Sequence, residues 1–234
     1  MGNAMPVISF ANGKGGSGKT TSALLLGCEF AQETDLTIID ADPRHPISRW
    51  AGLGNRPSRL TVVENDSEKT ILDQIDVAAT NTAWVIIDLE GVASRRVSYA
   101  LTQSDLVIIP AQEQQQDALA ALDVMQEIER DARAMRRSIP FSVLFTRTRV
   151  VAKSRTARHI ANQFRAHEKI DVFDVELNER DAFAALYTTG GTLRDLNPRD
   201  VNNIDKAIEN SFAFAAEVVR KVNALHDDKT REVA

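Results

Sequence analysis

The feature that most constrains this chain is a glycine-rich stretch near its start, GKGGSGKTT, at residues 13–21. It follows the apolar run PVISFA and precedes TTSALLLG, whose apolar spacing predicts a helix. Residues 13–20 match the pattern G-x-x-x-x-G-K-[ST], in which glycines allow backbone N–H groups to surround phosphate oxygens at a helix N-terminus. A strand, such a loop and a helix, in this order, predict a phosphate-binding loop in an α/β fold.

Apolar, β-branched runs alternate with helical patterns along the rest of the chain. The predicted strands are residues 6–11, 36–40, 60–64, 84–88, 105–110, 141–146 and 170–175, and the main predicted helices are 20–33, 67–80, 117–135, 154–168 and 199–226. Because the strands are almost continuously apolar, we predict a P-loop NTPase fold, a twisted, mostly parallel sheet of about seven strands with helices on both faces. We expect residues 1–234 to form a single domain, with its ligand beyond the carboxyl ends of the strands.

The last predicted helix carries an apolar stripe that we expect to pack in the core. Its members are Val201, Ile204, Ile208, Phe212, Ala215, Val219 and Val222. The mixed-charge segment that follows lacks the basic, aromatic-rich character of a membrane-surface helix.

Composition excludes several classes of protein. The single cysteine, Cys28, excludes an intramolecular disulfide framework and any metal cluster that one chain would ligate with several thiolates. No signal-peptide pattern and no run of 18 apolar residues occurs, so we expect a cytoplasmic protein without stable membrane insertion. The glycine-rich stretch begins so early that we expect no N-terminal helix-turn-helix domain.

Charge is unevenly distributed in this acidic chain, whose net charge is −5. Residues 132–167 contain no Asp or Glu but nine basic residues, which leaves 19 basic against 33 acidic residues elsewhere. The nine are Arg133, Arg136, Arg137, Arg147, Arg149, Lys153, Arg155, Arg158 and Arg165. This block indicates a surface for a polyanion, with ordinary solvated helix faces as the alternative.

The residue types of the glycine-rich stretch indicate binding of ATP and Mg²⁺. The predicted phosphate site comprises Gly13, Lys14, Gly15, Gly16, Ser17, Gly18, Lys19, Thr20 and Thr21. Lys19 is suited to neutralise charge on the β- and γ-phosphates, and the Thr20 hydroxyl is suited to bind Mg²⁺.

Acidic residues follow two of the predicted strands. Asp88 closes WVIID, and Asp40 and Asp42 lie in IIDADP. Asp88 is placed to hold Mg²⁺ through its water shell, whereas Asp40 and Asp42 could reach the metal and the attacking water. Taken singly, an Asp after a strand is more often a turn former or a helix cap, but three at strand ends together with a phosphate-binding loop favour the site.

These motifs together resemble the ParA/MinD group of P-loop ATPases, and ParA-like partition proteins in particular. KGGSGKTT resembles the group's deviant Walker A motif, IIDADPR its second motif, and WVIIDLEG its Walker B strand. DLVIIPAQEQQQDALAALDVM resembles the next strand and helix, with Asp117 at the matching place, and LNERDAFAAL occupies the place of a late loop that closes over the nucleotide base. The resemblance runs from about residue 6 to 225. The DADxxxPxSRW run and ERDAFAAL look closest to a subgroup associated with conjugative DNA transfer.

Two segments depart from the family pattern. Leu89-Glu90-Gly91 stands after Asp88 where the group often has DTPP, and Thr146-Arg147-Thr148-Arg149 stands where relatives often carry an Asn-Arg pair. Within the second segment, the resemblance implies contact with the nucleotide base by Arg147.

The resemblance implies a role for the second lysine of the stretch. Lys14 would reach the nucleotide of a second subunit in an ATP-bound homodimer, as an arginine finger does, so that dimerisation would gate hydrolysis. Asp42 would orient the attacking water, and Asp40 and Asp88 would support Mg²⁺. Hydrolysis would be slow until an activating ParB-like or adaptor protein binds.

The resemblance also implies nonspecific binding to double-stranded DNA, with the ATP-bound protein on the nucleoid. The candidate contacts are Arg149, Lys153, Arg155 and Arg158. Because no aromatic residues interleave with them to stack bases, the duplex backbone is the expected target.

Three other functions remain open. A MinD-like membrane-positioning ATPase and a small-molecule kinase or ligase would share the phosphate-binding loop. An iron–sulfur or nitrogenase-reductase type of protein would need cysteines paired between subunits, whereas Cys28 is expected in the core of the first helix.

Overall fold

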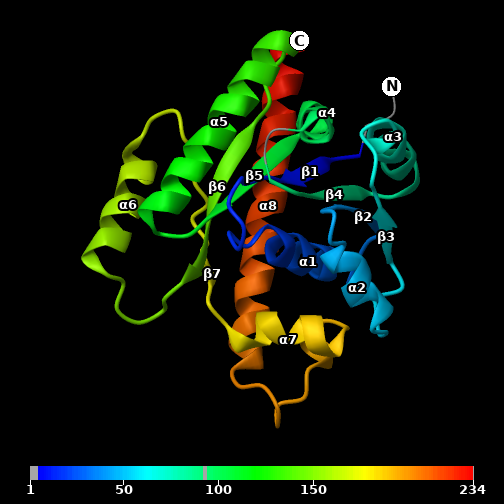
Figure 1. The fold of residues 1–234 in the computed structure, drawn as a ribbon, viewed down its shortest axis with the longest axis vertical. Coiled ribbons are helices and arrows are strands. Elements are labelled where there is room, and N and C mark those ends of the chain that lie inside the picture. The colour runs from blue at the N-terminus through cyan, green and yellow to red at the C-terminus, as the bar shows by residue number, and fades with distance from the viewer. Residues whose placement is uncertain (1–4, 92–93, 234) are drawn as a thin grey trace.

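A computed structural model describes residues 5–91 and 94–233 of the protein (Figure 1). In this described part of the chain, seven strands form a sheet in the order β3-β2-β4-β1-β5-β6-β7, and all pairings are parallel. The strands are β1 (Val7–Phe10), β2 (Leu36–Ala41), β3 (Leu60–Glu64), β4 (Trp84–Leu89), β5 (Leu106–Ala111), β6 (Phe141–Thr148) and β7 (Leu177–Asn178). The predicted parallel α/β fold is confirmed.

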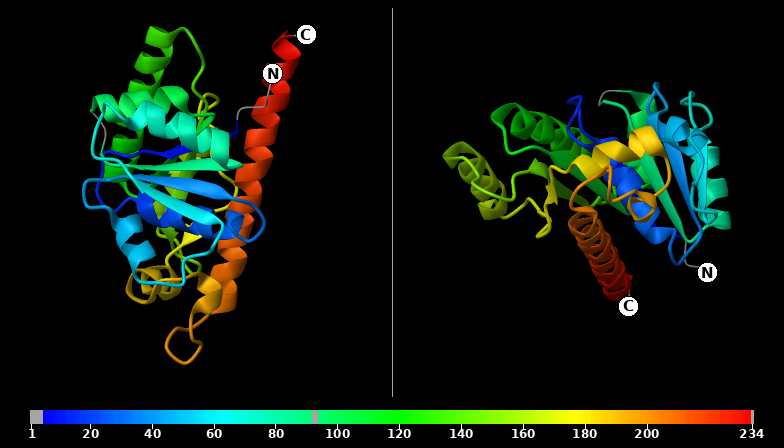
Figure 2. Two further views of the ribbon diagram at one scale, coloured as in Figure 1. Left: turned by 90° about the vertical axis from the view of Figure 1, so that its right-hand side faces the viewer. Right: turned by 90° about the horizontal axis from the view of Figure 1, so that it is seen from below.

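Helices cover both faces of the sheet (Figure 2). One face carries α1 (Lys19–Phe30), α2 (Pro46–Gly52), α7 (Asp181–Thr189), the short 3₁₀ turn η1 (Leu193–Asp195) and α8 (Ile204–Val233). The other carries α3 (Ile71–Asn81), α4 (Arg95–Gln103), α5 (Gln115–Met135) and α6 (Arg155–Ala166). Successive strand residues point to opposite faces, so Ile8 packs against the first group and Val7 against the second. This two-sided burial explains the continuously apolar strands.

The strand order places the glycine-rich loop at a crevice. After β1 the chain crosses on one face to β2, whereas from β4 it crosses on the other face to β5, on the far side of β1. The crossover direction therefore reverses beside β1. Loops at such a switch point lie apart and leave a binding crevice beyond the carboxyl ends of the strands.

The predicted seventh strand, residues 170–175, is wrong. In this segment Val172 makes one isolated bridge to Val143. The backbone N–H groups of Asp174 and Val175 instead donate to the buried Glu217 carboxylate of α8, at 2.8 Å each. Because these two backbone N–H groups are already bonded, strand pairing with β6 resumes only at β7, two residues later.

The stripe predicted for the last helix is wrong in part. The buried residues of α8 include Ile204, Ala207, Ser211, Phe214, Ala215, Val218 and Val222, whereas Phe212 is 62% exposed. Each four-residue step advances about 40° beyond a full turn, so two steps from Ile204 carry Phe212 off the buried face. The helix also begins later than predicted, at Ile204. None of the helices in the described residues is both long and apolar enough to cross a membrane.

Candidate nucleotide site

The glycine-rich loop turns sharply from β1 into α1, and its glycines are needed for that turn. Gly16 and Gly18 have φ values of +79° and +100°. A Cβ on Gly18 would approach the Thr146 side chain to 3.1 Å. Gly18 is the N-cap of α1 and provides no side-chain cap, which leaves backbone N–H groups of the first turn available to an anion.

A cavity of about 440 Å³ opens beside this loop. Residues 15–22 form one side, which we name the phosphate-loop wall. The opposite side, named the far wall, consists of Thr146, Arg147, Leu177, Asn178, Glu179, Arg180, Phe183, Ala184 and Tyr187. Asp42 and Arg44 also line the cavity. A cavity with a loop of free N–H groups on one side and apolar and polar side chains on the other has the size and character of a small-ligand site.

Most of the predicted nucleotide-binding residues line this cavity. They are Gly15, Gly16, Ser17, Gly18, Lys19, Thr20, Thr21 and Arg147. Gly13 and Lys14 do not line it. The far wall contacts the phosphate-loop wall, because the Thr146 hydroxyl donates to the Ser17 carbonyl at 2.6 Å and the Tyr187 hydroxyl lies 3.4 Å from Thr21 Oγ1.

Two buried carboxylates stand beside the loop. Asp40 and Asp88 are paired in register on β2 and β4, and both are fully buried. No hydrogen bond of ordinary geometry reaches either oxygen of Asp88 from the described residues. Burial raises the pKa of Asp88 to about 7, against the lowering effects of the nearby Thr20 hydroxyl and Lys19 ammonium. When it is ionised, a buried carboxylate without a hydrogen-bond partner needs a cation or ordered water to compensate its charge.

The donor set fits Mg²⁺ bound together with a nucleotide. The described residues contain no group of three or more His, Cys, Asp or Glu that could form an all-protein metal site. Mg²⁺ commonly keeps several waters and takes only one or two protein ligands beside substrate phosphates. The Thr20 hydroxyl and the Asp88 carboxylate are oxygen donors of the kind that this ion prefers.

Lys19 lies between the loop and these acids. Its ammonium donates to the Asn12 carbonyl at 3.0 Å. Burial lowers the pKa of Lys19, and the charges of Asp88 and Asp42 only partly offset this. An anionic ligand would restore the missing counter-charge.

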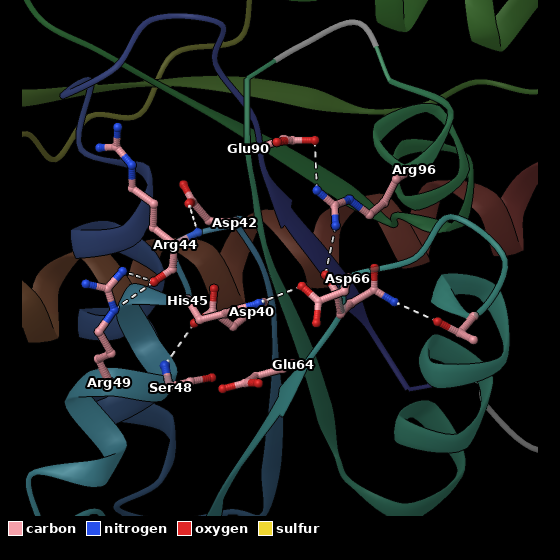
Figure 3. Close-up of polar contacts among 12 residues, drawn as sticks. Asp40, Asp42, Arg44, His45, Ser48, Arg49, Glu64, Asp66, Glu90 and Arg96 are labelled. Atoms are coloured by element: carbon pink, nitrogen blue, oxygen red, sulfur yellow. Dashed lines mark hydrogen bonds and ion pairs between the residues drawn. The ribbon is translucent and has the colours of Figure 1, made fainter.

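The loop after β2 positions Asp40 and Asp42 differently (Figure 3). Asp40 Oδ2 accepts from the Ser48 N–H at 2.8 Å, in the first turn of α2, whereas its Oδ1 is buried without a hydrogen-bond partner in the described residues. Asp42 Oδ1 accepts from the Arg44 N–H at 2.8 Å, and Asp42 lines the cavity. Asp40 therefore caps a helix and Asp42 stabilises a turn, but Asp42 also lines the cavity and can reach a ligand.

Sequence reasoning missed a buried arginine that joins three strand ends (Figure 3). Arg96 is 8% exposed and donates to Glu90 Oε1 and to the Asn65 carbonyl, at 2.8 Å each. The Asn65 N–H in turn donates to the Asp40 carbonyl at 3.0 Å. These contacts tie the loop after β4 to the ends of β2 and β3. Glu90, in the segment that departs from the DTPP pattern, thus contributes one of these contacts.

Lys14 lies apart from the cavity, on the side of α5. Its ammonium is paired with Asp117, whose side chain is fully buried, and its backbone N–H donates to Asn12 Oδ1 at 2.8 Å. The Asn12 amide donates to the Pro110 carbonyl at 2.7 Å, which fixes this corner to β5. The two lysines of the loop therefore face different parts of the protein.

The basic block of residues 132–167 does not form one surface. Three of its members, Arg133, Arg136 and Arg137, lie at the C-terminal end of α5, about 30 Å along that helix from its start beside the loop. Arg149, Arg155 and Arg158 are exposed at the other end, and their side chains form no hydrogen bond or ion pair with the described residues. Lys153, predicted with them, is instead paired with Glu113 and Glu176.

For the rest of the far wall, the sequence predicted the segment but not the individual residues. The segment LNERDAFAAL does border the cavity, but residues 181–189 form helix α7 rather than a loop. Asn178, Phe183 and Tyr187 were not singled out, because no local pattern marks them and only the fold brings them to the loop. Cys28 is 2% exposed in α1, as expected, and burial raises the pKa of its thiol, so it is not available as a cluster ligand.

The fold and this site define a P-loop nucleotide-binding protein of the ParA/MinD type. A family model described as VirC1 protein matches residues 5–224, and the chain belongs to this family of ParA-like P-loop ATPases. Protein ParA of Rhizobium radiobacter is 35% identical over 219 residues, which cover 93% of this chain and 98% of the relative.

Solved structures resemble the fold at lower identity. A plasmid partition protein from Borrelia burgdorferi has a TM-score of 0.63 at 16% identity and covers 94% of this chain and 100% of its own. MinD of Pyrococcus horikoshii, complexed with Mg-ADP, has a TM-score of 0.70 at 12% identity and covers 94% and 98%.

Proposed function

We propose that the protein is an ATP-dependent partition-type ATPase. Two copies with bound Mg-ATP form a homodimer that binds duplex DNA without sequence preference and positions DNA or another cargo. A ParB-like or adaptor protein stimulates hydrolysis to ADP and phosphate. The observation that carries this proposal is the placement of the two loop lysines, because Lys19 lines the cavity of its own chain and Lys14 lies outside it.

The residues of the cavity have complementary roles in this proposal. The N–H groups of residues 15–18 receive the phosphates, Lys19 neutralises their charge, and the far wall with Arg147 receives the base. Thr20 and Asp88 hold Mg²⁺, supported by Asp40, and the ion when bound neutralises charge that develops on the phosphates. Asp42 orients the attacking water from the open side of the cavity.

Lys14 supplies the step that depends on a second copy. To reach a partner's nucleotide it must leave Asp117, whose carboxylate is then buried and unpaired. Breaking a buried ion pair in this way costs about 3–5 kcal/mol, so the lysine leaves only when dimerisation offsets that cost. A cation delivered to the transferring phosphoryl group is worth roughly 10³–10⁵ in rate. The monomer is consequently a slow ATPase.

DNA binding is assigned to Arg149, Arg155 and Arg158, which are exposed and lie in the segment that follows β6. Each phosphate contact lowers log K by about 0.9 for every tenfold rise in salt. Retention on DNA should therefore fall steeply with salt and depend little on sequence.

The test compares retention on nonspecific duplex DNA with and without Mg-ATP. Wild type should be retained only with Mg-ATP, and Arg155→Ala/Arg158→Ala should lose most of that retention. Arg133→Ala/Arg136→Ala is a matched control, since it removes the same charge from the opposite end of α5. Equal loss in both double variants would remove the assignment of the surface. No ATP-dependent retention by wild type, or retention on anionic vesicles instead, would overturn the proposed function.

A further inference from the structure

Lys153 is held between two carboxylates that come from distant parts of the chain. Its ammonium donates to Glu113 Oε1 at 2.7 Å and also to Glu176. Only 8% of the Glu113 side chain and 17% of the Glu176 side chain are exposed. Arg165 adds a second cation, 3.3 Å from Glu176, so the charges compensate one another. We refer to Lys153, Glu113 and Glu176 as the Lys153 clamp.

Each carboxylate of the clamp leads to a different wall of the nucleotide cavity. Glu113 follows Gln112, whose side-chain amide donates to the Gly16 carbonyl of the phosphate-loop wall at 2.9 Å. Glu176 precedes Leu177 of the far wall, and its own carbonyl accepts from Asn210 of α8 at 2.8 Å. A displacement of either wall therefore moves one of the two groups that hold Lys153.

Lys153 itself belongs to the segment that carries the exposed arginines. We name residues 149–158, which comprise the loop after β6 and the first turn of α6, the arginine loop. Ser154, the neighbour of Lys153, caps α6 by accepting from the Ala157 N–H at 3.0 Å. At the tip, Val150 and Val151 are 70% and 82% exposed, so little apolar packing holds this loop. Ile160 and Phe164 anchor the buried face of α6 in the core, and the clamp ties the loop just before this helix to both walls of the cavity.

We propose that Lys153 is a positioning residue that couples nucleotide binding in the cavity to DNA binding by the arginine loop, and that it is not itself a phosphate contact. This inference rests on the proposed function. Coupling between two sites typically changes affinity by about 5–150-fold and is reciprocal. Loss of the clamp should reduce that factor and leave the arginines present.

The test measures the Kd for a nonspecific duplex at one fixed salt concentration, with Mg²⁺ and either a non-hydrolysable ATP analogue or ADP. In wild type the two Kd values should differ by about 5–150-fold. Lys153→Met should bring this ratio close to one, whereas Lys153→Arg, which can pair with both carboxylates, should restore most of it. By reciprocity, DNA should tighten binding of the ATP analogue in wild type but not in Lys153→Met.

Arg155→Ala/Arg158→Ala is the matched comparison, because it should weaken both Kd values and preserve their ratio. If Lys153→Met weakened both Kd values equally and kept the ratio, Lys153 would be a phosphate contact and the inference would be wrong. A wild-type ratio of one would instead overturn the proposed function.

Thermal melting of each variant shows whether it is folded. If Lys153→Met does not fold, Glu113→Gln opens the clamp from its other side and should likewise lower the ratio. Glu129→Gln, an exposed site on α5, is its control and should leave the ratio unchanged. An unchanged ratio in a folded Glu113→Gln would also overturn the inference.

Discussion

The two walls of the nucleotide cavity are built in opposite ways. The phosphate-loop wall is one continuous stretch between β1 and α1, shaped by glycines with positive φ. The far wall collects residues from the end of β6, from β7 and from α7, and is held by packing against α1 and α2. Phosphate binding, which all nucleotides share, thus depends on one short stretch of sequence. The surface that would distinguish one nucleotide from another depends on segments that only the whole fold brings together.

The largest expected effect separates Lys19, in the phosphate-loop wall, from Lys14, which lies just outside it. Lys14→Ala should reduce partner-stimulated ATP hydrolysis by roughly 10³-fold or more while leaving most nucleotide binding intact, because Lys14 lies outside its own cavity. Lys19→Ala should instead abolish nucleotide binding. Steady-state hydrolysis and binding of a fluorescent nucleotide separate the two. Unchanged hydrolysis in Lys14→Ala would contradict a role in trans.

Asp88→Asn should have opposite effects on function and stability. Mg²⁺-dependent nucleotide binding by wild type should weaken as pH falls from 8 to 6, because Asp88 has a pKa of about 7 and takes up a proton. The variant should bind weakly at every pH in this range. Binding measured by calorimetry at several pH values, with and without Mg²⁺, shows the difference, and an equally steep pH profile in Asp88→Asn would exclude Asp88 as its cause.

The same carboxylate should make the nucleotide-free protein less stable at high pH. Between about pH 4 and pH 7 the folded state keeps a proton on Asp88 that the unfolded state has lost, so this group lowers the free energy of unfolding as pH rises. Asp88→Asn should therefore be more stable than wild type at pH 8, by roughly 1–3 kcal/mol. Urea denaturation at pH 5 and pH 8 measures this, and a variant that is less stable at pH 8 would contradict it.

A substitution at Gly190 tests whether the far wall depends on packing. Gly190, after α7, has φ +70°, and a Cβ there would lie 2.8 Å from the Gly54 carbonyl. Gly190→Ala should lower the free energy of unfolding by about 1–3 kcal/mol and weaken nucleotide binding through displacement of α7. Gly52→Ala is the control, since no described residue outside its own helical turn lies within 4 Å of its Cβ position. Equal stability of the two variants in urea would show that the far wall tolerates displacement.

The contrast between the walls also explains what the sequence could and could not predict. The continuously apolar runs that alternate with helical patterns predicted the parallel sheet, and the glycine pattern predicted the loop, because both signals depend on residues close together in the chain. The strand expected at residues 170–175 failed because a carboxylate from α8 takes its backbone donors. The predicted burial of Phe212 was wrong for a related reason, since the hydrophobicity of a residue does not show whether it lies on the buried face of its helix.

Charge was the least predictable property of the site. Lys153 belongs to a segment with no acidic residue, yet its partners are Glu113 and Glu176, which lie 40 and 23 residues away in the chain. Arg96 and Glu90 likewise become a pair only because α4 returns beside the end of β4. Charge runs in a sequence show which groups are present, and tertiary structure decides which of them remain free.

The smallest expected effect concerns α2, which packs against both α1 and α7. Its first turn is held at Asp40, and its Trp50 indole donates to the Gly191 carbonyl beyond α7 at 3.0 Å. Before it, His45 has φ +44° and its Nε2 lies 2.8 Å from Asp66 Oδ1.

Partial burial lowers the pKa of His45, but the hydrogen bond to Asp66 and the charges of Asp40 and Glu64 outweigh it, so the pKa is raised. The stabilisation is therefore fully present below the unfolded pKa of about 6.5 and is lost as pH rises through the higher folded value. Because Asp66 is 75% exposed, the pair is worth only about 0.2–1 kcal/mol. Asp66→Asn should lower the free energy of unfolding by that amount at pH 6 and leave it unchanged at pH 8.5, as measured in urea. The Gly190→Ala defect should in contrast be the same at both pH values, so a pH-independent Asp66→Asn effect would mean that this turn, like the far wall, is held by packing and not by charge.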